Sequence, residues 1–92
     1  MNTELHTLLL ELDNRFDIEL DDYFNLTEDQ KAELTQAIVN YFTPYAQSHF
    51  QALGNIRRGL RIIIDESEYF DEYEKADIFN RCLKRFEKMT FF

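Results

Sequence analysis

Apolar residues recur every three or four positions through most of this chain, and only residues 17–24 alternate in the manner of a β-strand. A strand needs a partner, and no second segment of the sequence offers one. We therefore expect an all-α protein in which residues 17–24 form a connector or a short helical turn. The sequence predicts four amphipathic helices.

The first predicted helix covers residues 4–14, after Thr3 as N-cap. Leu5, Leu8, Leu9, Leu12 and, beyond the helix end, Phe16 fall at helical spacing in this segment. The second helix begins after Thr27, which forms a capping box with Gln30. We expect it to end at Phe42, since a proline disfavours helical geometry in the residue before it.

The third predicted helix begins at Thr43-Pro44, read as an N-cap and a first-turn proline. Glycines interrupt it at Gly54 and Gly59, and a break near Gly54 stays open as an alternative. Its apolar stripe is Ala46, Phe50, Leu53, Ile56, Leu60 and Ile63.

The fourth predicted helix follows a turn at residues 68–70 and a second cap at residues 71–74. Its expected inner face is Tyr73, Ala76, Phe79, Leu83 and Phe86, with Ile78, Cys82 and Met89 beside it. Short connectors join all four segments. The predicted fold is therefore an irregular antiparallel four-helix bundle that forms a single domain over residues 1–92.

Net charge restricts the partners of such a bundle. The 92 residues carry 18 acidic and 10 basic side chains, which gives a formal charge of -8. Much of the excess lies in two acidic blocks, at residues 11–22 and 65–77. Because such blocks repel phosphate and anionic lipid headgroups, we expect neither direct nucleic-acid binding nor membrane binding. A lone cysteine suits a reducing compartment, and we expect a cytoplasmic protein.

Catalytic and metal-binding patterns are weak in this sequence. Asp17, Glu19, Asp21 and Glu28 match part of a calcium-loop template, but Asp22 stands where the template needs glycine. The two histidines, His6 and His49, lack metal-ligand spacing, and Cys82 is expected to be buried and inert. We therefore predict no metal, no cofactor and no enzymatic activity.

Arginines form the one basic group in the middle of the chain, at Arg57, Arg58 and Arg61. Arg57 and Arg61 share a helix face and would suit a phosphate, although the acidic blocks oppose this. Pairing of Arg61 with Asp65, four residues later, is the simpler interpretation.

Aromatic and acidic residues alternate just before the second and the fourth predicted helices. Both helices would begin at the same end of an antiparallel bundle, so the two stretches would form one surface. Its rings would anchor a partner, and its carboxylates would attract a basic protein. The candidate binding residues are Asp21, Asp22, Tyr23, Phe24, Glu68, Tyr69, Asp71, Glu72 and Tyr73.

In size, charge and the run Glu68-Tyr69-Phe70-Asp71-Glu72-Tyr73-Glu74-Lys75-Ala76-Asp77-Ile78-Phe79, the chain resembles the small helical immunity proteins of bacterial toxin–immunity pairs. The resemblance implies an inhibitor that blocks a basic, nuclease-like toxin domain. The chain lacks the Asp-x-Ile-Tyr-Tyr-Pro stretch of the DNase-colicin immunity proteins, so the resemblance identifies no particular toxin.

Two further functions are open from the sequence. One is a nucleic-acid mimic that fills the groove of a DNA-binding protein, although the basic segments interrupt the acidic surface. The other is a non-catalytic helical adaptor that self-associates weakly through Phe91 and Phe92.

Overall fold

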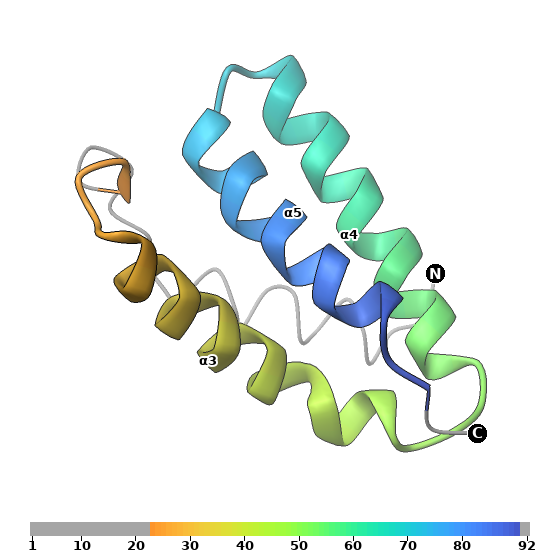
Figure 1. Ribbon diagram of the computed structural model, residues 1–92. Coiled ribbons are helices and arrows are strands. Elements are labelled where there is room, and N and C mark those ends of the chain that lie inside the picture. The colour runs from red at the N-terminus through yellow and green to blue at the C-terminus, as the bar shows by residue number, and fades with distance from the viewer. Residues whose placement is uncertain (1–22, 91–92) are drawn as a thin grey trace.

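Three α-helices make up residues 23–90, the part of the chain that the computed structural model describes. They are α3 (Glu28–Ala46), α4 (Ala52–Tyr69) and α5 (Tyr73–Glu87). Figure 1 shows that α4 runs antiparallel to both α3 and α5, and that α4 and α5 lie side by side. The all-α class is confirmed, whereas the predicted first helix and the connector before residue 23 lie outside the described residues.

The capping box predicted at the start of α3 is confirmed. Thr27 Oγ1 accepts a hydrogen bond from the Gln30 amide at 3.1 Å, and Gln30 Oε1 accepts one from the Thr27 amide at 2.9 Å. Glu28 and Asp29 occupy the first turn, where negative charge is favourable to the helix dipole. Local sequence therefore sets the beginning of this helix.

The predicted end of this helix at Phe42 was wrong, because α3 continues through Pro44 to Ala46. Proline removes one helical hydrogen bond and strains the residue before it. Beyond the proline, however, Tyr45 and Ala46 are 3% and 0% exposed. Burial of these two residues holds the last turn in helical geometry against a local preference to stop.

The stripe predicted for the third helix was wrong at its beginning. Residues 47–51 form the connection between α3 and α4, and Phe50 is 75% exposed instead of buried. The helix is continuous through Gly54, so the alternative of a break there is also wrong. The face of α4 that packs inward consists of Ala52, Ile56, Leu60, Ile64 and Ser67.

Helix α5 lacks the predicted cap, since its N-cap residue Glu72 makes no side-chain capping hydrogen bond. Tyr73 was also wrongly assigned to the inner face, because it is 55% exposed. The remaining pattern is confirmed, and the residues that α5 buries are Ala76, Ile78, Phe79, Cys82, Leu83 and Phe86.

The core lies where the three helices meet. Phe42 of α3 and Phe86 of α5 are both fully buried and contact edge to face, with ring centroids 6.2 Å apart. Ile56 and Leu60 of α4 are each 1% exposed and belong to the same cluster. Burial of such side chains contributes about 1.5–3 kcal/mol each, which is the main stabilisation of this fold.

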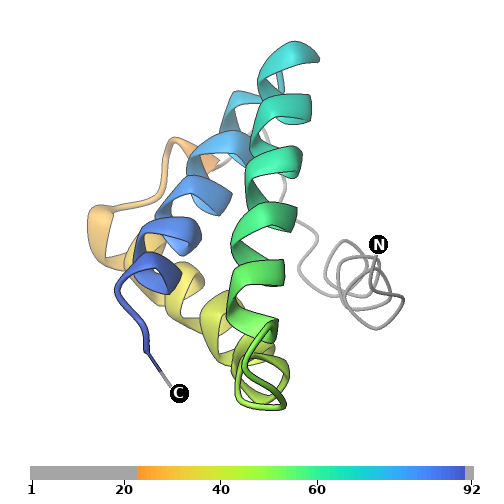
Figure 2. The ribbon, with the colours of Figure 1, turned by 90° about the vertical axis from the view of Figure 1, so that its right-hand side faces the viewer.

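Two arginines of α4 join that helix to the end of α5. The Arg57 guanidinium donates to the Phe86 carbonyl, from Nε at 3.0 Å and Nη2 at 2.6 Å, and to the Met89 carbonyl at 2.9 Å. Arg57 thus adds donors at the end of α5, where the Phe86 carbonyl also accepts from the Met89 amide at 3.2 Å. Arg61 pairs with Glu87 at 3.5 Å, which corrects the predicted pairing with Asp65. Figure 2 shows α5 beside the upper part of α4.

Candidate functional site

A tight turn at residues 70–72 connects α4 to α5. The amide of Asp71 donates to the Glu68 carbonyl at 3.2 Å, and the amide of Glu72 donates to the Ser67 carbonyl at 2.7 Å. This pair of bonds is the Schellman pattern, which requires a left-handed residue at the first position beyond the cap. That residue is Asp71, with a φ of 60°. The turn was predicted at residues 68–70 and lies later, because α4 extends to Tyr69.

Asp71 occupies a position where glycine is preferred. A left-handed conformation costs an L-residue about 1–2 kcal/mol, somewhat less for aspartate, whose short polar side chain makes local hydrogen bonds. Asp71 makes such a bond, because its Oδ1 accepts from the Tyr73 hydroxyl at 2.8 Å. This bond to the carboxylate raises the pKa of the Tyr73 phenol. Backbone strain retained in a surface turn is a feature associated with functional sites.

Three aromatic rings project from this turn into solvent. Tyr69 is 81% exposed, Phe70 is 66% exposed and Tyr73 is 55% exposed. The rings of Tyr69 and Phe70 contact edge to face, with centroids 5.0 Å apart. Aromatic side chains this exposed leave a large apolar area in water, which association with another surface would remove.

Carboxylates surround these rings. Residues 65–74 contain six acidic residues and no basic residue. Glu68 and Asp71 are exposed, and Glu72 is half-buried. We name the surface formed by Glu68, Tyr69, Phe70, Asp71, Glu72 and Tyr73 the acidic–aromatic turn.

Of the other half of the predicted surface, Asp21 and Asp22 lie outside the described residues. Tyr23 is 1% exposed, so the prediction that its ring is available to a partner was wrong. Phe24 is 55% exposed and contacts the Tyr23 ring edge to face at 5.3 Å between centroids. Only one aromatic residue of this half therefore reaches the surface within the described range.

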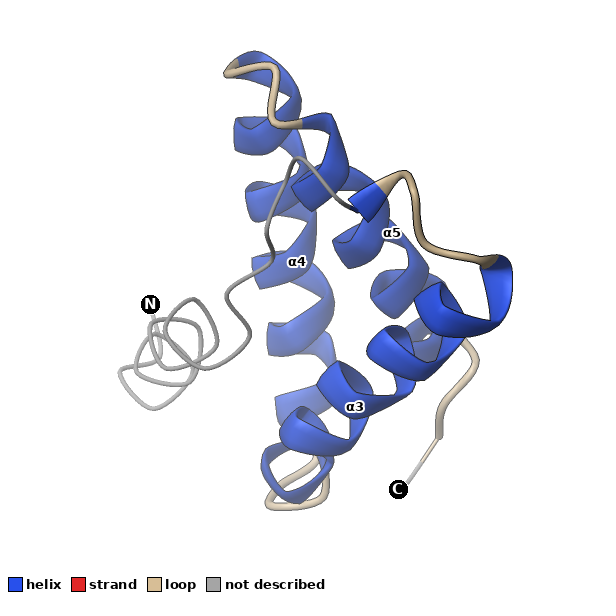
Figure 3. Cartoon of the chain, turned by 90° about the vertical axis from the view of Figure 1, so that its left-hand side faces the viewer, coloured by secondary structure: helices blue, strands red, loops and turns tan. Residues whose placement is uncertain are grey.

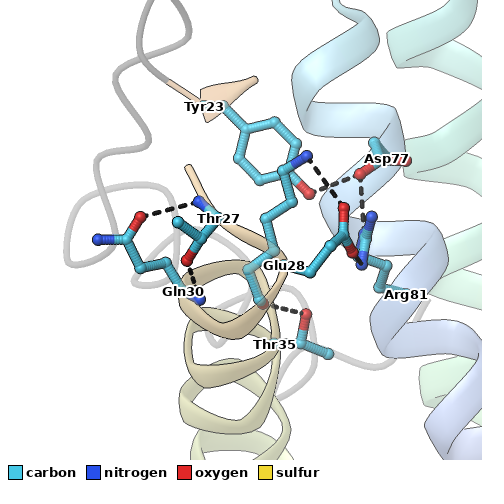
Figure 4. A network of polar contacts seen from close by, with 8 residues as sticks. Tyr23, Thr27, Glu28, Gln30, Thr35, Asp77 and Arg81 are labelled. Atoms are coloured by element: carbon cyan, nitrogen blue, oxygen red, sulfur yellow. Dashed lines mark hydrogen bonds and ion pairs between the residues drawn. The ribbon is translucent and has the colours of Figure 1, made fainter. Parts of the chain in front are cut away.

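Tyr23 is buried because its hydroxyl has a partner in α5. It donates to Asp77 Oδ2 at 2.6 Å, and Arg81 Nε donates to the same oxygen at 2.9 Å (Figure 4). Arg81 also pairs with Glu28 at 3.1 Å, and Glu28 pairs with Lys31 at 3.6 Å. We name these five residues the Tyr23 network. It fixes the segment that enters α3 against α5. Figure 3 shows the backbone of this segment, a loop before α3.

Electrostatics of the Tyr23 network favour a neutral Tyr23 phenol, an ionised Asp77 and a charged Arg81. Burial and the neighbouring Asp77 carboxylate raise the pKa of Tyr23 well above its usual value. Burial opposes ionisation of Asp77, but hydrogen bonds from Tyr23 and Arg81 outweigh it and lower the pKa of that carboxyl. The bond to Asp77 raises the pKa of Arg81, which stays charged. Such a network stabilises the fold and offers no reactive group.

The described part of the first half, Tyr23 and Phe24, lies toward the same end of the molecule as the acidic–aromatic turn. Helices α3 and α5 run in the same direction (Figure 1), and Tyr23 contacts Asp77, four residues after Tyr73. Residues four apart share a helix face, so Tyr73 lies one turn from the contact with Tyr23. Phe24 and the acidic–aromatic turn are therefore both near the beginning of α5.

Candidate reactive groups in the described range are few. Cys82 is 0% exposed, and burial raises the pKa of its thiol to about 12, so the thiolate nucleophile is not formed at neutral pH. His49 accepts a hydrogen bond from the Gln51 amide at 3.3 Å and contacts the Tyr45 ring. Within residues 23–90, no three His, Cys, Asp or Glu side chains are grouped to hold a metal ion.

None of the helices in the described range is both long and apolar enough to cross a bilayer.

Comparison of the chain with family models, with curated proteins and with solved structures finds no match. The functional interpretation therefore depends on the acidic–aromatic turn itself.

Proposed function

We propose that this chain is a non-catalytic, cytoplasmic inhibitor of the immunity type, which binds a basic and nuclease-like protein domain through the acidic–aromatic turn. One observation carries the proposal: Tyr69, Phe70 and Tyr73 are 81%, 66% and 55% exposed beside Glu68, Asp71 and Glu72. Exposed rings at the centre of a patch and carboxylates around it are the composition of a protein interface that selects a basic partner.

Each component of the turn has a distinct part in this binding. The rings of Tyr69 and Phe70 would enter an apolar pocket of the partner, where aromatic anchors contribute most of the affinity. The carboxylates of Glu68 and Glu72 would pair with lysine or arginine at the rim and accelerate association. Asp71 would present a carboxylate from a backbone that the Schellman pattern already fixes, which lowers the entropic cost of binding.

A binding experiment with a basic, nuclease-like toxin domain tests this function. The full chain and the double variant Tyr69→Ala/Phe70→Ala are titrated against that domain by calorimetry. The double variant should bind at least about a hundredfold more weakly, because two exposed anchors are lost. The matched control is Phe50→Ala, which removes an exposed ring from the α3–α4 connection and should bind normally. Equal affinity of all three proteins would contradict the proposal.

Competition with nucleic acid separates the proposed inhibitor from a nucleic-acid mimic. Duplex DNA would displace a mimic from any partner. The carboxylates of such a mimic would form one continuous stretch that fills the DNA-binding groove of the partner. In the described residues, Arg61 and Arg81 pair with acidic side chains and interrupt such a stretch. The interruption favours the protein-binding proposal, and displacement by DNA at equal charge concentration would contradict it.

We also propose that residues 4–14 form a fourth helix that completes an irregular antiparallel bundle. Helices α3 and α4 contact each other much less than each contacts α5. Leu34 and Tyr41 of α3 and Ile63 of α4 pack on the core but stay partly exposed. A helix with Leu5, Leu8, Leu9 and Leu12 on one face would add apolar contacts of the kind that such bundles use.

Substitution within residues 4–14 tests the fourth helix by its effect on stability. Leu8→Asp should lower the free energy of unfolding of the full chain by more than about 2 kcal/mol, since it would bury a carboxylate. Thr7→Asp introduces the same side chain on the opposite helix face and should have little effect. Equal, small effects of the two substitutions in urea denaturation would contradict the four-helix arrangement.

A further inference from the structure

One face of α4 is exposed along the length of the helix. Ile62, at its middle, is 55% exposed, and Arg58, Asp65 and Glu66 on either side are also exposed. These residues follow one another at steps of three or four positions and so share a helix face. This face lies opposite the buried row that includes Ile56 and Leu60. In Figure 2, no described helix lies in front of α4.

Charge on α4 is arranged against the helix dipole. The first part of the helix contains Arg57, Arg58 and Arg61, and the last part contains Asp65, Glu66 and Glu68. Helices are stabilised by acidic residues near the beginning and basic residues near the end, yet α4 has no acid in its first turn and no base in its last turn. Helix stability does not account for this order of charges.

Contacts within the chain explain only part of it. Arg57 and Arg61 bind the end of α5. Among the residues that the structure describes, Arg58 donates to the side chain of Asn55, one turn earlier in the same helix. Within residues 23–90, no ion pair involves Arg58, Asp65 or Glu66. Arg58 is therefore exposed four residues before Ile62. Asp65 and Glu66 are exposed on the same face, three and four residues after Ile62.

We propose that two copies of this chain associate through this face, with their α4 helices antiparallel and crossing at Ile62. A two-fold axis passes through the crossing point at Ile62. Each residue that precedes Ile62 in one copy then lies opposite the residue that follows Ile62 by the same number of positions in the other copy. Arg58 of each copy then meets Asp65 and Glu66 of the other, and the two Ile62 side chains contact at the centre. The order of charges that opposes the helix dipole becomes complementary in the pair.

A single helix face provides a small interface. Stable specific interfaces bury about 1,200–2,000 Å² in total, and an isolated helix pair provides less. We therefore expect a weak, reversible dimer with a dissociation constant of about 10–1,000 μM. Because its charged residues are Arg58, Asp65 and Glu66, it is separable from the acidic–aromatic turn, whose carboxylates are Glu68, Asp71 and Glu72.

Sedimentation velocity of the full chain up to about 1 mM measures the dimer directly. The acidic variant is Arg58→Glu, and the basic variant is Asp65→Arg/Glu66→Arg. Each variant alone places like charges opposite one another and should weaken self-association at least about tenfold. An equimolar mixture of the two variants restores opposite charges at both contacts and should form a heterodimer at least as readily as the unmodified chain forms its dimer.

Matched controls carry the same change of charge elsewhere. Lys84→Glu matches the acidic variant, and Asp29→Arg/Glu33→Arg matches the basic variant; all three positions are exposed. These controls should self-associate like the unmodified chain, and circular dichroism should show all variants folded. The proposal is overturned if the chain sediments as a monomer throughout, or if the variants and controls behave alike. Loss of the dimer on deletion of Phe91 and Phe92, with no effect of the charge reversals, would also overturn it.

Discussion

Replacement of Asp71 by glycine should make the protein more stable and should weaken its binding to a basic partner. Asp71 has a φ of 60° at the position where the Schellman pattern favours glycine. Glycine adopts this conformation without the steric cost that a Cβ atom causes. The two backbone hydrogen bonds of the turn, from Asp71 to Glu68 and from Glu72 to Ser67, do not involve the side chain and should persist.

The size of the effect follows from two opposing contributions. Relief of the left-handed conformation gains less than the about 1–2 kcal/mol that it costs most L-residues, because aspartate tolerates it better. Glycine also increases the freedom of the unfolded chain, which costs about 0.5–1 kcal/mol. The lost hydrogen bond from Tyr73 to Asp71 lies in solvent and contributes little. The two contributions leave a net gain of about 0–1 kcal/mol, which corresponds to a rise in Tm of up to about 8 °C for a domain of this size.

Thermal and urea denaturation followed by circular dichroism measure this gain. Asp71→Ala is the matched control, because it removes the same carboxylate while keeping a Cβ atom in the left-handed residue. We expect the order of stability Asp71→Gly, then the unmodified chain, then Asp71→Ala. If Asp71→Gly is no more stable than Asp71→Ala, the backbone strain inferred at this turn is wrong.

Three further predictions concern the core and α4. Tyr23→Phe should lower the free energy of unfolding by about 1–2 kcal/mol at pH 7, because Asp77 loses a donor. Since the folded-state pKa of Tyr23 is raised, its stabilisation is complete below pH 10 and is lost at higher pH, so the difference in urea midpoints should shrink there. Gly54→Ala should raise stability by about 0.5–1 kcal/mol, since a Cβ atom would meet only Arg58 Nη1 at 3.6 Å; an unchanged Tm would contradict this. Cys82 should react with iodoacetamide only at the rate of unfolding, and rapid alkylation of the native chain would contradict its burial.

Much of the fold could be predicted from local sequence signals. The capping box at Thr27 and the apolar spacing of α5 identify both elements correctly, because each signal acts within one or two helical turns. The course of the chain at Pro44 could not be predicted this way. There, the burial of Tyr45 and Ala46 by distant residues outweighs a local preference that favours a helix end.

The candidate site also combines features that local sequence determines with features that distant residues determine. The acidic–aromatic turn is exposed because charged residues on both sides of Tyr69 and Phe70 keep that stretch in water. Burial of Tyr23 depends on Asp77, which is 54 residues away in sequence, and no local pattern indicates that pairing. The left-handed conformation of Asp71 could not be predicted from the sequence either, because glycine is the residue that usually indicates such a position.

The rate of association with a basic domain, measured against salt concentration, tests the central claim most directly. Stopped-flow fluorescence would compare the unmodified chain, Glu68→Gln/Glu72→Gln in the turn, and Asp29→Gln/Glu33→Gln on α3 as a control of equal charge. If the turn guides binding, the unmodified chain and the control should both slow steeply as salt increases, and the turn variant should be slower at low salt with a shallower dependence. Identical salt dependence of all three proteins would contradict the claim that these carboxylates face the partner.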